Sequence, residues 1–89
     1  MTNADKLFEE LGYEKEEDNE DFIAYQNKDI AKLIEIYCNR KTISVYEVID
    51  NETLLTGEIT IPELKAINEK VKELGWLDDW RRIEKIWIY

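Results

Sequence analysis

Apolar residues recur at helical spacing near the start of the chain. In the stretch "KLFEELGY", Leu7, Phe8 and Leu11 fall on one side of a helix. The pattern predicts a helix from Thr2 or Asn3 to Leu11, because either polar residue can accept a hydrogen bond at the N-cap. The apolar side of this helix should pack on a core.

The clearest helix start lies in the second half of the chain. The stretch "TIPE" places Thr60 as the N-cap, Pro62 in the first turn and Glu63 at the third helical position, which is the pattern of a capping box. The predicted core stripe of this helix is Leu64, Ile67, Val71 and Leu74. Its predicted solvent side is Lys65, Glu69, Lys70, Lys72 and Glu73.

Both helical segments run into the same ending, which is leucine, glycine and an aromatic residue. Gly12 and Gly75 suit the left-handed conformation that closes many helices, because glycine has no Cβ to clash there. We expect Tyr13 and Trp76 to fold back as the apolar contact of a Schellman-type helix end.

Between the helices the apolar period shortens to two, which is typical of strands. The alternating stretches are "DFIAYQN", "AKLIEIYC", "TISVYEVI" and "ETLLTGEIT". Turn-forming pairs separate them at Asp18-Asn19, Asn39-Arg40 and Asp50-Asn51. The pattern predicts an α+β fold: an antiparallel β-meander of four or five strands flanked by an N-terminal helix and a C-terminal helix.

The middle strands carry apolar or aromatic residues on both faces. One of them alternates Ile34, Ile36 and Cys38 with Leu33, Glu35 and Tyr37. A sheet with one solvated face shows a cleaner alternation. The two helices can cover one face, so we expect another segment to cover part of the second face.

All three tryptophans lie in the last 14 residues, "WLDDWRRIEKIWIY". We expect residues 1–77 to form one domain and residues 78–89 to form an amphipathic extension that packs on the domain or on a partner subunit. Packing on the second face of the same sheet is the leading interpretation, and contact with a twin subunit or a foreign partner are the alternatives. The extension can end as a helix or as an edge strand. Its candidate contact residues are Trp80, Arg81, Arg82, Trp87 and Tyr89.

The net charge of −9 is concentrated near the start of the 89-residue chain. Residues 1–30 hold ten acidic residues and three lysines, whereas residues 61–89 hold six acidic and six basic residues. This charge disfavours direct nucleic-acid binding, because phosphate contacts need a basic surface. No apolar run is long enough to span a membrane, and the start of the chain does not have the pattern of a signal peptide. A single cysteine favours a reducing cytoplasm.

The catalytic inventory is poor. Without histidine, no Ser–His or Cys–His pair can exist, and a zinc site is excluded in practice. Ser44 and Cys38 fall in predicted strands, where packing roles are expected. Three scattered glycines cannot form a phosphate-binding loop. We therefore expect a protein that is not an enzyme and that has no cofactor.

The stretch "EKEEDNED" carries the strongest local charge. Its spacing does not match a calcium-binding loop, and it has no glycine for the tight turn, so metal binding is disfavoured. It can be a solvated hairpin around Asp18-Asn19, or an acidic docking face for a basic protein; such a face can imitate nucleic-acid phosphates. The candidate partner-binding residues are Glu14, Glu16, Glu17, Asp18, Glu20 and Asp21.

The stretches "ADKLFEELGYEKEE" and "ITIPELKAINEKVKELGWL" resemble small uncharacterised proteins encoded by phages and prophages of Gram-positive bacteria. The resemblance covers residues 4–77 and transfers no site residue. It implies an accessory phage protein that acts in the host cytoplasm. The chain departs from the pattern by continuing past Leu77, so its last 12 residues are candidates for an activity of its own.

By analogy with anti-CRISPR proteins of similar size and charge, the resemblance favours inhibition of a host defence factor that has a basic surface. One alternative is a protein that sequesters a small nucleotide signal in a pocket formed across a homodimer. Its pocket would use Arg40, Lys41, Arg81 and Arg82 beside Trp80 and Trp87. Another alternative is a structural module that assembles into oligomers.

Overall fold

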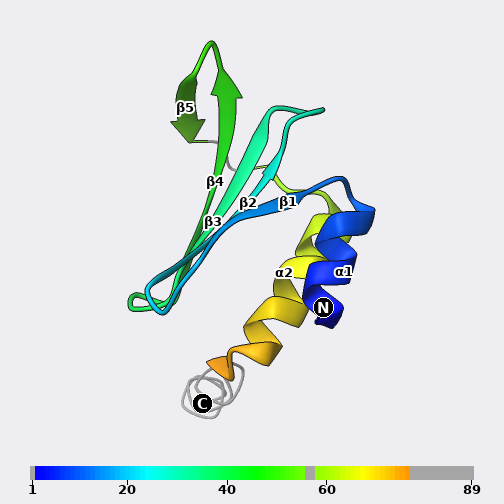
Figure 1. Cartoon of the computed structure of the whole chain (residues 1–89), viewed down its shortest axis with the longest axis vertical. Helices are drawn as coiled ribbons and strands as arrows, with labels where there is room; N and C mark the ends of the chain where they lie inside the picture. The colour runs from blue at the N-terminus through cyan, green and yellow to red at the C-terminus, as the bar shows by residue number, and fades with distance from the viewer. Residues whose placement is uncertain (1, 56–57, 77–89) are drawn as a thin grey trace, which may run out of the picture.

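The computed structural model describes residues 2–55 and 58–76 and confirms the predicted α+β meander (Figure 1). Seven elements follow one another along the chain: α1 (Asn3–Glu10), β1 (Glu14–Asp18), β2 (Phe22–Asn27), β3 (Lys32–Tyr37), β4 (Thr42–Ile49), β5 (Glu52–Leu55) and α2 (Ile61–Glu73). The strands form one antiparallel sheet in the order β1-β2-β3-β4-β5. The predicted extension 78–89 lies outside the described residues.

The hairpins close at the predicted turns and at one that the sequence analysis did not identify. Asp50 and Asn51 both have positive φ, at 51° and 65°, which is the backbone of a two-residue hairpin that follows the strand twist. The unforeseen turn joins β2 to β3. There the buried Asn27 accepts hydrogen bonds from the N–H groups of Asp29 and Ile30 through its Oδ1. This local bond lets the chain reverse without a glycine.

Both helices lie on the same face of the sheet (Figure 1), and the core fills the space between the helices and the sheet. The large buried strand residues come from the alternate positions that face the helices, whereas the small buried Ala24 lies on the opposite face. These core residues are Ile23, Tyr25, Ile34, Ile36 and Val45 from the sheet, with Tyr13 from the segment after α1. Phe8 from α1 and Ala66 and Ile67 from α2 complete the core. The expectation that the two helices cover one face is therefore confirmed.

The end of α1 has the predicted Schellman geometry. Gly12 has a φ of 93°, its N–H donates to the Glu9 carbonyl, and the Tyr13 N–H donates to the Phe8 carbonyl. Tyr13 is buried, with its ring edge against Phe8. The Asn27 side chain donates to the Leu11 carbonyl, so this helix end is also capped from β2. Gly75 at the end of α2 also has a positive φ, 78°, and its N–H donates to the Lys72 carbonyl, while Trp76 packs against the core.

Helix α2 begins as predicted, with Thr60 and Glu63 forming a complete capping box. Its buried side differs from the prediction. Leu64, expected in the core, is 38% exposed, whereas Lys70, expected in solvent, is 6% exposed. The reason is that α2 packs against α1 as well as the sheet, which turns its buried side toward Glu63, Ala66, Ile67 and Lys70. The carboxylates of Asp5 and Glu73 lie beside the buried Lys70, and Lys32 pairs with the buried Glu63, so neither charge is buried without a partner.

Gly12 and Gly75 form a matched pair for testing the helix ends. Alanine at Gly75 meets no atom within 4 Å, so it should lower the free energy of unfolding only by the left-handed penalty, about 1 kcal/mol. Alanine at Gly12 would place its Cβ 3.1 Å from Asn27 Nδ2. We expect Gly12→Ala to cost about 2 kcal/mol or more, measured by urea unfolding. Equal losses in the two variants would show that the Asn27 contact is unimportant.

Candidate partner-binding site at the acidic edge

The acidic stretch forms β1, one of the two edge strands of the sheet, and the turn that follows it. All six predicted partner-binding residues are exposed, and the structure places them next to one another along this edge: Glu14, Glu16, Glu17, Asp18, Glu20 and Asp21. The pairing with β2 shifts between Lys15 and Glu17, which marks a β-bulge at Glu16. The hairpin around Asp18-Asn19 is confirmed. We call these six residues the acidic edge.

The strand pairing divides the acidic edge between the two faces of the sheet. Lys15 and Asp18 lie opposite Tyr25 and Ile23, on the helix side. Glu14 and Glu17 lie opposite Gln26 and Ala24, on the other side. The acidic edge therefore presents carboxylates in both directions from a single strand.

Few of these carboxylates are neutralised within the chain. Lys15 Nζ lies 2.8 Å from Asp18 and 3.0 Å from Asp5. Asp21 accepts a hydrogen bond from Asn39 Nδ2 at 2.9 Å. The other four carboxylates make no hydrogen bond or ion pair with the described residues: Glu14, Glu16, Glu17 and Glu20. Exposed carboxylates at this density make a negative field that a basic surface can complement.

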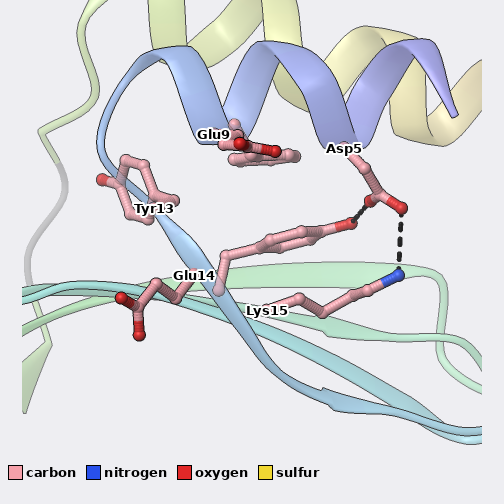
Figure 2. Close-up of a pocket in the computed structure, with 7 residues that line it drawn as sticks. Asp5, Glu9, Tyr13, Glu14 and Lys15 are labelled. Carbon is pink, nitrogen blue, oxygen red and sulfur yellow. Dashed lines mark hydrogen bonds and ion pairs between the residues drawn. The ribbon is translucent and has the colours of Figure 1, made fainter. Parts of the chain in front are cut away.

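A pocket of about 580 Å³ lies between α1 and β1, beside the acidic edge (Figure 2). Phe8 and Tyr25 stack at its base, with ring centroids 3.9 Å apart. Asp5 and Lys15 pair at one end, and Glu14 points away from the helix (Figure 2). Because Lys15 is already paired with two carboxylates, the pocket offers no unpaired cation for a phosphate. Its chemistry does not favour an anionic nucleotide ligand.

Asp5 is the point where four elements of the fold meet. Its carboxylate accepts a hydrogen bond from the Tyr25 hydroxyl at 2.7 Å and lies 3.4 Å from Lys70 Nζ of α2. Lys15 reaches it from β1. Burial raises the pKa of Asp5, but the hydrogen bonds and the two ammonium groups outweigh this effect and lower its pKa to about 2. The carboxylate is therefore ionised at neutral pH and holds the strand against the helices.

A second polar cluster surrounds Glu63 at the start of α2. Its carboxylate accepts hydrogen bonds from the Tyr13 hydroxyl, from Lys32 Nζ at 2.7 Å and from the Thr60 N–H at 2.7 Å. Burial raises the pKa of Glu63, and these donors reverse the effect, so its pKa lies below the usual value. Burial and the bond to Glu63 raise the pKa of Tyr13. The capping glutamate thus also anchors β3 and the α1–β1 connection.

These two clusters are structural features that the sequence analysis missed. It identified Glu63 as a cap but gave no role to Asp5, Tyr25 or Lys70. The spacing of Asp5 and Phe8, one helical turn apart, was the available signal. It places a carboxylate and an aromatic ring on one side of α1. A buried tyrosine can then stack its own ring on the aromatic ring and donate its hydroxyl proton to the carboxylate.

The remaining candidate residues are only partly described. Arg40 lies in the turn between β3 and β4, with its guanidinium 4.5 Å from the centre of the Tyr37 ring, and Lys41 follows it. Cys38, which was predicted to lie in a strand, instead begins this turn directly after the end of β3, and burial raises the pKa of its thiol. The tail residues Trp80, Arg81, Arg82, Trp87 and Tyr89 lie outside the described residues.

Residues 2–55 and 58–76 contain no group of three or more histidine, cysteine, aspartate or glutamate side chains placed to hold a metal ion. The helices within these ranges are too short or too polar to cross a membrane. No protein-family model, curated protein or solved structure matches the chain. Function is therefore inferred from the residues themselves.

The ionised Asp5 makes stability depend on pH in a defined window. Its pKa of about 2 lies below the unfolded value of 3.8, so its contribution is complete above pH 4 and disappears as the pH falls toward 2. This difference corresponds to about 2 kcal/mol. We expect Asp5→Asn to unfold at lower urea concentration at neutral pH and to differ less from the natural protein near pH 2. A constant difference across this range would contradict the role of Asp5.

Proposed function

We propose that the protein acts by binding a partner protein that has a basic surface, with the acidic edge as the contact. The observation that carries the proposal is the exposure of all six carboxylates on β1 and its turn, four of them without a partner among the described residues. A bulged, charged edge strand also prevents unwanted pairing between sheets. That role concerns the strand itself, whereas Glu20 and Asp21 lie in the turn beyond it.

The proposal is also supported by the distribution of charge along the chain. Residues 1–30 carry a net charge of −7 out of the total of −9. Concentrating charge on one edge accelerates encounter with an oppositely charged partner and orients the two proteins before contact. Charges on the rim of an interface are screened by salt, with a Debye length of about 8 Å at physiological ionic strength. Binding through the acidic edge should therefore weaken as salt increases.

The narrower proposal is that the partner is a host defence factor and that binding inhibits it. It is supported by the resemblance of residues 4–77 to phage and prophage proteins and by the need of nucleic-acid-processing enzymes for basic surfaces. On this proposal the carboxylates of the acidic edge occupy a surface that otherwise contacts phosphates. An RNA-guided nuclease is one protein of this kind.

Charge reversal on the acidic edge tests the binding proposal. Glu16→Lys with Glu17→Lys changes two exposed carboxylates that have no partner among the described residues. We expect this variant to lose at least tenfold in affinity for a basic protein recovered with the natural chain from a Gram-positive host lysate. The affinity of the natural chain should fall with added salt, and the variant should show a smaller salt dependence. Both are measured by titration with the purified partner.

The matched control is Asp29→Lys with Glu52→Lys. It changes the net charge by the same amount at the exposed turn between β2 and β3 and at the β5 edge. The control should keep nearly the full affinity if the acidic edge is the contact. Equal losses in both variants would indicate a general charge effect, and no loss in either would remove the acidic edge as the binding site.

The defence proposal has its own test. Cells that carry an active RNA-guided nuclease should retain a targeted plasmid at least tenfold more often when they express the natural chain than when they express the Glu16→Lys, Glu17→Lys variant. A binding partner found without any effect on plasmid retention would favour another target while leaving the binding proposal intact.

A further inference from the structure

The face of the sheet opposite the helices carries apolar side chains that have no role in the acidic edge. Its residues occupy the alternate positions of β2, β3 and β4. Most are half-buried, and no other described element covers them: Phe22, Leu33, Glu35, Tyr37, Tyr46 and Val48. We call this surface the open face. Five of the six are aromatic or branched apolar residues, and the sixth is Glu35.

The side chains of the open face are already ordered. The Phe22 and Tyr37 rings lie 5.4 Å apart, and the Tyr37 hydroxyl donates to Glu35 at 2.8 Å. Hydrogen bonds to Glu35 and Tyr46 raise the pKa of Tyr37. A preformed apolar surface with one central carboxylate is suited to a segment that brings apolar side chains and a cation.

Residues 77–89 have the composition that this surface requires. They contain Trp80, Ile83, Ile86, Trp87, Ile88 and Tyr89, together with Arg81, Arg82 and Lys85. The cations match the carboxylates on the open side of the sheet, which are Glu14, Glu17 and Glu35. The other side of the sheet is already occupied by α1 and α2.

The length and starting point of this segment also fit. Trp76 packs against the core, and α2 ends beyond the end of the sheet that carries the β1–β2 and β3–β4 turns (Figure 1). Thirteen extended residues reach about 43 Å. Crossing five strands requires about 19 Å, since neighbouring strands lie about 4.8 Å apart. The segment is therefore long enough to pass this end of the sheet and cross it.

We propose that residues 77–89 fold back over the open face of their own chain and form the third layer of the domain. The aromatic residues of the segment pack on Tyr37, Leu33 and Tyr46, and an arginine pairs with Glu35. Such a layer buries apolar surface on both sides of the sheet, which a chain of 89 residues needs for stability.

Paramagnetic relaxation in the full chain tests this arrangement. A spin label is attached at Glu84→Cys in a Cys38→Ala background, and the amide signals are compared with those of a diamagnetic label at the same position. We expect Leu33, Tyr46 and Val48 to lose most of their signal intensity. Residues in the first turns of α1 and α2 should keep theirs. Loss of signal intensity only at the end of α2, or loss of signal intensity on the helices, would overturn the proposal.

A mixed sample distinguishes packing of the segment on its own chain from packing on a second copy of the chain. Spin-labelled protein without isotope label is combined with isotope-labelled protein that carries no spin label. The proposal expects no intensity loss in this mixture. Loss at Leu33 and Tyr46 in the mixture would show that the segment covers a twin subunit and would overturn packing within one chain.

One substitution on the open face should release the segment, and a second substitution serves as its control. Leu33→Glu places a charge in the middle of the open face, and Leu64→Glu is its control on the outer side of α2, where Leu64 is 38% exposed. Leu33→Glu should restore the signals of Tyr46 and Val48, and Leu64→Glu should not. If Leu33→Glu does not fold, Trp87→Asp in the segment provides the same measurement. Unchanged broadening in the released variants would contradict the proposal.

Discussion

The fold depends on how α1 holds one tyrosine of the central sheet. Tyr25 lies 1% exposed on β2, with its ring stacked on Phe8 and its hydroxyl bonded to Asp5 one helical turn away. A buried tyrosine needs both contacts, since an unpaired hydroxyl in the core would lose its hydration without compensation. Because Lys15 and Lys70 also converge on Asp5, this contact connects β1 and α2 to the same point.

This arrangement explains how a strand made mostly of carboxylates belongs to the sheet at all. Strands of Glu and Asp are unfavourable, and every residue of β1 is exposed, so apolar burial cannot hold it in place. Its backbone pairing with β2 and the ion pairs of Lys15 supply the attachment instead. The carboxylates that remain are then free to face solvent. Within β1, Lys15 and Asp18 take part in the attachment, and the carboxylates of Glu14, Glu16 and Glu17 remain for the proposed contact.

The sequence was informative where a structural feature depends on neighbouring residues. Thr60 and Glu63 form a cap within three positions, and Gly12 and Gly75 mark the helix ends, so these features were predicted correctly. The burial of Lys70 was not predictable, because it depends on Asp5, 65 positions away, as well as on Glu73. Likewise, the six carboxylates were found from their clustering, whereas their division between two faces required the register set by the bulge.

The two edges of the sheet differ in the chemistry of their exposed side chains. The β5 edge carries exposed Leu54 and Leu55, while the β1 edge carries carboxylates and a bulge. An apolar edge favours strand pairing with another chain and burial of apolar surface. A charged edge disfavours both, and it attracts opposite charges over a longer range. A partner that approaches the β1 edge must therefore supply cations.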